Sequence, residues 1–119
     1  MQNRIALKIA GVLGFLGVAL GAFGAHGLKN ILSANDTATI WQTAVLYHLL
    51  HSVSGLWASE RRPLVVWIWA AGVLFFSGSL YVLAVTNLRW LGAITPLGGL
   101  LLLAGWAILI FSKKGAKLH

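Results

Sequence analysis

Long apolar runs alternate with short polar segments along this chain. The runs cover four stretches of the 119 residues: 6–26, 37–59, 64–86 and 92–112. Each is close to the roughly 20 residues that an α-helix needs to cross the hydrocarbon core of a bilayer. The pattern predicts an all-α protein, an integral membrane four-helix bundle, in which residues 1–119 form a single transmembrane domain.

The polar segments contain residues that favour helix starts. Pro63 follows three charged residues and is well placed to open the third helix. Pro96, directly after Thr95, either opens a shorter fourth helix or kinks a longer one, and the first arrangement is favoured. Three side chains that precede the second run could cap the start of its helix: Ser33, Asn35 and Asp36.

Composition agrees with a membrane protein and changes how the charge is interpreted. Hydrophobic residues make up 59% of the chain and charged residues 9%, whereas soluble domains carry about 25% charged residues. The net charge of +7 would suggest nucleic acid in a soluble protein, but here the basic residues lie near the ends of the apolar runs. Topology and lipid headgroups explain them better, so we expect a lipid bilayer and no nucleic acid as partner. The absence of cysteine excludes disulfides and thiolate chemistry.

The basic residues also predict an orientation. If four helices alternate across the bilayer, Lys29 and Arg89 fall on one side and seven basic residues on the other. The seven are Arg4, Lys8, Arg61, Arg62, Lys113, Lys114 and Lys117. Positive charge concentrates on the cytoplasmic side of membrane proteins, so we expect a multi-pass protein of the cell inner membrane with both termini in the cytoplasm. The tryptophans are placed as in an interfacial aromatic belt: Trp41, Trp57, Trp90 and Trp106 lie near span ends, and Trp67 and Trp69 lie about one turn inside a span.

Glycines recur every three or four residues along the first run. On a helix, four of them share one face: Gly14, Gly17, Gly21 and Gly24. Inside a membrane such a face lets another backbone approach closely and gain van der Waals contact. We expect it to pack within the protein's own bundle, and the alternatives are a seam between copies in a homo-oligomer or a ligand groove.

Two histidines interrupt the second run near mid-membrane. At about 100° per residue, one face of this helix collects six residues, with Tyr47 at its edge. The six are Trp41, Ala44, His48, His51, Ser52 and Gly55. Leucines occupy the opposite side, so we expect both histidines to point into the bundle. Ionisable groups inside a membrane are costly and are therefore functional candidates.

The histidines have a structural and a functional interpretation. The structural one, which is favoured, makes them neutral partners of polar groups on neighbouring helices. The functional one makes them part of a ligand, cofactor or proton site. No metal site is predicted, because the only carboxylates, Asp36 and Glu60, lie at span ends. The candidate ligand-binding residues are His26, Tyr47, His48, His51, Ser77, Ser79, Tyr81 and Thr95.

Several motifs resemble a known family. They are GAFGAHGLK (21–29), WQTAVLYHLLH (41–51), FSGSLYVL (76–83), TPLGG (95–99) and GW (105–106). They are similar to the YgdD-like small integral membrane proteins, the domain-of-unknown-function 423 family, to which a vertebrate transmembrane protein is related. The resemblance implies a four-helix inner-membrane protein and brings no activity, cofactor or catalytic residue. Positions matching Tyr47 and His51 are typical of it, whereas that of His48 is often another polar residue, which favours His51 with His26.

Three functions fit these features. The leading hypothesis is a non-enzymatic membrane protein that acts as a helix-packing homo-oligomer or as an accessory subunit of a larger membrane complex. The second is a binder of a lipid, quinone or haem through the His/Ser/Tyr face. The third is a small oligomeric channel or transporter for protons or small solutes, with His51 as the titrating group. An enzyme is not expected, because the sequence has no acid pair, nucleophile set or phosphate loop.

Overall fold

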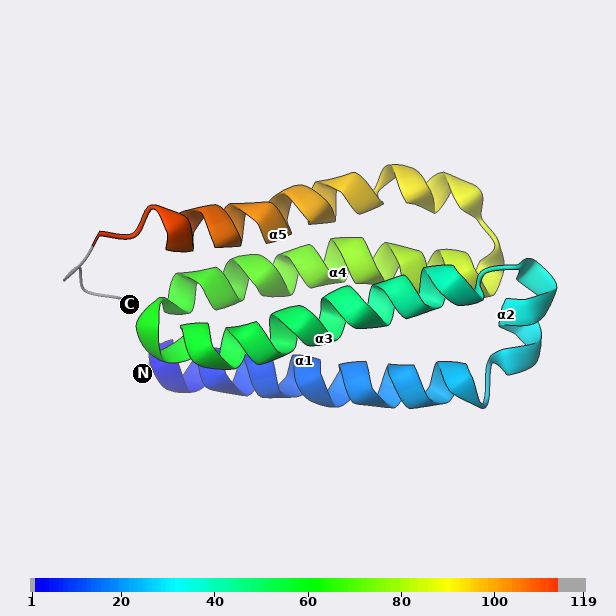
Figure 1. Cartoon of the computed structure of the whole chain (residues 1–119), viewed down its shortest axis with the longest axis horizontal. Coiled ribbons are helices and arrows are strands. Elements are labelled where there is room, and N and C mark those ends of the chain that lie inside the picture. The colour runs from blue at the N-terminus through cyan, green and yellow to red at the C-terminus, as the bar shows by residue number, and fades with distance from the viewer. Residues whose placement is uncertain (1, 114–119) are drawn as a thin grey trace.

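The computed structural model describes residues 2–113, with side chains from Arg4 onward. The elements are α1 (Gln2–Ala25), α2 (Lys29–Asn35), α3 (Ala38–Arg61), α4 (Pro63–Thr86), the 3-10 helix η1 (Arg89–Ala93) and α5 (Thr95–Ile110). Within this part of the chain, four long helices lie side by side, and α2 closes one end of the molecule (Figure 1). The start of α1, the turn between α3 and α4, and the end of α5 lie at the opposite end (Figure 1).

The segment before α3 forms the short helix α2, which the apolar pattern did not predict. Thr37 occupies the N-cap position of α3, and no side chain caps that helix start. The expectation that Ser33, Asn35 or Asp36 would cap α3 is therefore wrong. Ser33 and Asn35 belong to α2, and Asp36 ends it in the left-handed backbone region with a φ of 55°.

The side chains of Asn35 and Thr37 instead donate hydrogen bonds to carbonyls in the last turn of α4. The hydroxyl of Thr37 donates to the carbonyl of Ala84 at 2.7 Å, and the amide of Asn35 donates to the carbonyls of Ala84 and Val85 at 3.1 Å each. The last carbonyls of a helix have no partner inside that helix. The α2–α3 connection therefore caps the end of its neighbour α4.

The prediction that Pro63 and Pro96 mark the starts of two helices is confirmed. α4 begins at Pro63, and α5 begins at Thr95 with Pro96 as its second residue. A separate 3-10 helix, η1, precedes α5, so the apolar run predicted to start at residue 92 is divided in two. Thr95 does not cap α5, because its hydroxyl lies 2.6 Å from that of Ser79 in α4.

Among the described residues, three segments are long and apolar enough to cross a membrane: Arg4–His26, Pro63–Thr86 and Arg89–Ile110. The second predicted span is not one of them. Its helix, α3, has 24 residues, which is as long as α1 and α4. It differs in carrying a face of buried polar groups, which lowers its overall apolar character.

α4 is the central helix. It packs against α1, α3 and α5, and α1 also packs against α3. Over the residues described, no α-carbon of α5 lies within 8 Å of an α-carbon of α1 or α3. Among the long helices, the backbone of α5 therefore packs against that of α4 alone. The arrangement is therefore a compact α1–α3–α4 group with α5 attached to the outside of α4.

The side-chain distribution is that of a membrane-embedded protein. Trp69, Val65 and Val66 of α4 are fully buried, together with small residues of α1 such as Ala6 and Ala10. The outer surface is covered by large apolar side chains on every long helix, which water would not solvate. They include Phe15, Leu50, Val53, Leu74, Leu103 and Ile110.

Candidate functional site

The glycine face of α1 packs against α3. A methyl group added at Gly17 would lie 2.6 Å from Leu49, and one added at Gly24 would overlap the indole of Trp41. At Gly14 and Gly21 the nearest atoms also belong to α3. These contacts support packing within the chain, the favoured interpretation of this face. α3 covers the face, except that Gly21 and Gly24 also line a groove at the end of α1.

The helical wheel of α3 is confirmed. All six residues of its predicted inner face are buried, including His48 and His51, each with 3% of its surface exposed. Leu50 and Val53 on the opposite side are exposed. One side of α3 is therefore polar and buried and the other is apolar and exposed, because polar and apolar residues alternate along it with the 3.6-residue period of a helix.

His48 and Ser77 connect α3 to α4. The Nδ1 atom of His48 lies 2.8 Å from the hydroxyl of Tyr81, and the hydroxyl of Ser77 donates to the carbonyl of Ala44 at 2.7 Å. The other ring nitrogen of His48, Nε2, is buried and has no hydrogen-bond partner among the described residues. It is a polar atom whose role the packing does not explain.

His51 has both ring nitrogens occupied. Its Nδ1 lies 2.8 Å from the carbonyl of Tyr47, and its Nε2 accepts a hydrogen bond of 3.0 Å from the indole of Trp106 in α5. A carbonyl can only accept and an indole can only donate, so these partners fix the neutral tautomer with the proton on Nδ1. The ring also meets Trp69 edge-on at 5.3 Å. No nitrogen of His51 is free for a metal or haem iron.

The remaining candidates are distributed over the molecule. Ser79 and Thr95 bond each other, which joins α4 to α5, and Tyr47 packs on Phe76 of α4. His26 is exposed in the turn after α1. The structure does not bring it to His51, since the neighbours of His51 on α3, His48 and Ser52, lie against Gly17 and Gly14, about 15 Å from His26 along α1.

Four of the six tryptophans have exposed side chains, as residues of an aromatic belt would have: Trp57, Trp67, Trp90 and, with 37% of its surface exposed, Trp106. Trp41 and Trp69 are buried, and their indoles donate to the carbonyls of Leu20 and Leu102, both at 3.0 Å. The indole of Trp106 donates to His51, so three indoles connect neighbouring helices. Their positions in the sequence do not distinguish them from the other three tryptophans.

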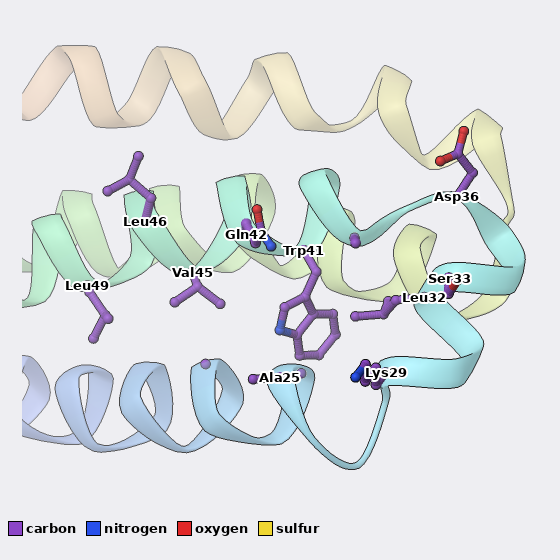
Figure 2. Close-up of a pocket in the computed structure, with 13 residues that line it drawn as sticks. Ala25, Lys29, Leu32, Ser33, Asp36, Trp41, Gln42, Val45, Leu46 and Leu49 are labelled. Atoms are coloured by element: carbon purple, nitrogen blue, oxygen red, sulfur yellow. The ribbon is translucent and has the colours of Figure 1, made fainter.

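A groove of about 710 Å³ lies at the α2 end of the molecule, between α1, α2 and α3 (Figure 2). Ligand sites usually have volumes of about 300–1,000 Å³. Its polar lining consists of Lys29, Ser33, Asp36 and Gln42. The rest of its lining consists of Gly21, Gly24, Ala25, Leu32, Ala38, Trp41, Val45, Leu46 and Leu49. None of the ligand-binding candidates chosen from the sequence lines it.

The groove is polar at one end and apolar along its length. Lys29 and Asp36 lie at the two ends of α2, whereas Trp41, Val45 and Leu49 point from α3 towards α1 further along (Figure 2). From Ala38 to Leu49 the helix rises about 17 Å. This is close to half of the roughly 30 Å hydrocarbon core, so the groove has the length of one leaflet.

The apolar outer surface and the membrane-crossing helices define a small multi-pass membrane protein. A family model described as "Protein of unknown function (DUF423)" matches residues 20–99. The chain is 43% identical over 117 residues to UPF0382 membrane protein SH2409 of Staphylococcus haemolyticus, covering 92% of this chain and 94% of that protein. It is 40% identical over 118 residues to the UPF0382 inner membrane protein YgdD of Escherichia coli K12, covering 92% and 89%.

The chain therefore belongs to the DUF423 family of UPF0382 membrane proteins and is a multi-pass inner-membrane protein. This agrees with the resemblance noted from its motifs. No solved structure matches the chain.

Proposed function

We propose that this protein is a non-enzymatic, four-span membrane protein that binds an amphipathic lipid in the groove between α1, α2 and α3. The observation that carries the proposal is the shape and lining of the groove, which is polar at the α2 end and apolar over about the depth of one leaflet. An amphipathic molecule of the bilayer has the same distribution of polar and apolar parts.

The proposed topology makes α3 the fourth span. α3 matches α1 and α4 in length, packs against both, and turns its polar face inwards and its apolar face outwards. The start of α1 and the turn between α3 and α4 lie at one end of the molecule, and they carry Arg4, Lys8 and the Arg61–Arg62 pair (Figure 1). The other end contains α2 and η1, which carry Lys29 and Arg89. Lys114 and Lys117, which enter the charge count, lie outside the described residues. This charge distribution supports cytoplasmic termini.

Reporter fusions test the topology. We expect a C-terminal fusion partner that works only in the cytoplasm to be active and one that works only in the periplasm to be inactive. The reverse pattern would contradict the proposed orientation.

The inner polar residues support lipid binding in the groove rather than a cofactor or channel function at the histidines. Among the described residues, His51, Ser77, Ser79 and Thr95 are each engaged by groups of the chain itself. A quinone, haem or ion path at these four residues would have to displace those bonds, whereas the buried Nε2 of His48 has no partner among the described residues. The groove needs no such rearrangement.

Ala25→Phe tests the proposed function. Ala25 lines the groove and is exposed, so a phenyl ring there fills the groove without entering the core. Ala19→Phe is the matched control, because Ala19 is exposed on the same helix and does not line the groove. Native mass spectrometry of protein extracted in mild detergent measures the retained lipid. We expect retained lipid on the wild type and on Ala19→Phe, and its loss from Ala25→Phe.

Equal lipid retention by both alanine variants would contradict binding in the groove. Absence of lipid from the wild type would also contradict it. Both results concern the groove alone, because neither substitution touches the inner polar face.

A second candidate function is assembly with other membrane helices, as a homo-oligomer or as an accessory subunit. It is favoured by α5, whose backbone packs against α4 alone among the long helices of the described residues and which exposes Leu97, Leu100 and Leu103. The glycine face of α1 does not contribute, because α3 covers it. Crosslinking in intact membranes tests this function: a defined larger species is expected, and a lone monomer in cells and in nanodiscs would exclude it.

A further inference from the structure

We infer that the lipid held in this groove is a phospholipid whose headgroup carries a primary ammonium beside its phosphate. This inference rests on the proposed function and adds the class of headgroup. It is carried by two opposite charges at the polar end of the groove, Lys29 and Asp36. A headgroup with one anionic and one cationic centre complements such a pair.

Lys29 and Asp36 are available to a ligand. Both residues line the groove, and neither forms an ion pair or side-chain hydrogen bond with another described residue. The nearby cation Arg89 is used elsewhere, because it donates to the side chain of Asn87 and to the carbonyl of Asn35. The carboxylate of Asp36 is therefore not neutralised by the neighbouring arginine.

The backbone holds Asp36 in place. It ends α2 in the left-handed conformation, with a φ of 55°, and its N–H bonds to the carbonyl of Ser33 at 3.1 Å. Thr37, the next residue, is fully buried and bonded to the end of α4. The carboxylate therefore projects from a fixed point, whereas the long side chain of Lys29 can adjust its reach.

The spacing of the two charges suits an aminophospholipid. Lys29 and Asp36 are seven residues apart across α2, which corresponds to a helical rise of about 10 Å. The lysine side chain, a phosphate, a two-carbon linker and an ammonium can bridge this distance. The acyl chain would then extend along Trp41, Val45 and Leu49 into the leaflet.

Asp36 also discriminates between headgroups. An anionic lipid such as phosphatidylglycerol offers Lys29 a phosphate but places no cation at the carboxylate. Phosphatidylcholine carries a cation, but its methylated nitrogen has no N–H to donate to a carboxylate. Only a primary ammonium offers both the charge and the hydrogen bond, which is the stronger combination.

Competition among three phospholipids tests the inference. The full chain is exchanged into micelles with equal amounts of phosphatidylethanolamine, phosphatidylglycerol and phosphatidylcholine of identical acyl chains, and native mass spectrometry measures the retained species. We expect the wild type to favour phosphatidylethanolamine by about threefold to fivefold, the range for a pair of partly exposed charges.

Three variants assign the preference to residues. Asp36→Asn keeps a side chain that tolerates the left-handed backbone, and we expect it to remove the preference for phosphatidylethanolamine over phosphatidylglycerol. Lys29→Gln should weaken retention of all three lipids about threefold to fivefold. Lys113→Gln, the same change of charge beyond α5, should alter nothing.

The outcomes separate the two proposals. Equal retention of the three lipids by the wild type, with loss in Ala25→Phe, would overturn the headgroup inference and leave the groove function standing. An unchanged lipid preference in Asp36→Asn would overturn the headgroup inference, as would equal effects of Lys29→Gln and Lys113→Gln. Retention of no lipid at all would overturn both proposals.

Discussion

The backbones of α4 and α5 come into direct contact at Gly98. A methyl group added there would overlap the backbone nitrogen of Phe76, with the α-carbon of Phe76 at 2.7 Å and the carbonyl oxygen of Gly72 at 2.8 Å. Carbon atoms normally approach to about 3.5–4.0 Å. The change Gly98→Ala therefore forces α5 outwards by about 1 Å, because neither backbone can rotate away as a side chain can.

The structure gives the expected magnitude. Overpacking of a well-packed interface costs about 1–3 kcal/mol. Displacing α5 also strains the bond from Trp69 to the carbonyl of Leu102 and the bond between Ser79 and Thr95, each worth about 0.6 kcal/mol inside a membrane. α5 packs its backbone against α4 among the described long helices, and its bond from Trp106 to His51 of α3 would be strained by the same displacement rather than compensate for it. We expect Gly98→Ala to lower the free energy of unfolding by about 2–4 kcal/mol.

The adjacent glycine supplies the control. A methyl group at Gly99 would lie 3.7 Å from the ring of Phe76, an ordinary van der Waals contact. Gly99→Ala should therefore change the free energy of unfolding by less than about 0.5 kcal/mol. Unfolding by dodecyl sulfate in mixed micelles, followed by tryptophan fluorescence, measures both variants. Equal stability of Gly98→Ala and Gly99→Ala would refute the reasoning.

Two further predictions concern hydrogen bonds and use the same unfolding measurement. Trp106→Phe removes the indole donor from His51 and should destabilise the protein by about 0.6–1.7 kcal/mol, whereas Trp90→Phe, an exposed control, should have no effect. Thr37→Val removes the buried hydroxyl bonded to the end of α4 and should cost about 1 kcal/mol, and Thr37→Ser should retain most of that stability. Wild-type stability of Trp106→Phe or of Thr37→Val would contradict the corresponding prediction.

The sequence predicts the long helices well, and it also predicts which face of α3 is buried. The 3.6-residue period places His48 and His51 on the same side as Trp41, and all three are buried. Pro63 and Pro96 mark helix starts because proline lacks the N–H that a helix interior needs. These features depend on local chemistry, which a single sequence contains.

Contacts between distant segments are harder to predict. Trp69 and Trp67 lie two residues apart on one helix, yet the first is buried against α5 and the second is exposed. Which indole finds a carbonyl depends on the neighbouring helix and on its distance. The close α4–α5 contact at Gly98 is not predicted for the same reason, because it depends on how near the backbone of Phe76 comes in the fold.

The groove could not be predicted from the apolar pattern. One of its walls is α2, a seven-residue helix that is too short to be stable by its own propensity and that forms where the chain bonds to the end of α4. Its signal in the sequence was limited to the small residues Gly21 and Gly24 facing α3 and to the opposite charges Lys29 and Asp36. Those features acquire meaning only when the three helices are placed together.

Photo-crosslinking with a phospholipid that carries a diazirine on its acyl chain tests the central claim most directly. The labelled lipid is incorporated with the full chain in vesicles, and the modified residues are mapped by peptide mass spectrometry. Binding in the groove predicts labelling concentrated at Val45 and Leu49, and its loss in Ala25→Phe. Labelling spread evenly over exposed positions such as Leu74 and Leu103, unchanged in that variant, would show an ordinary lipid-facing surface and contradict the account.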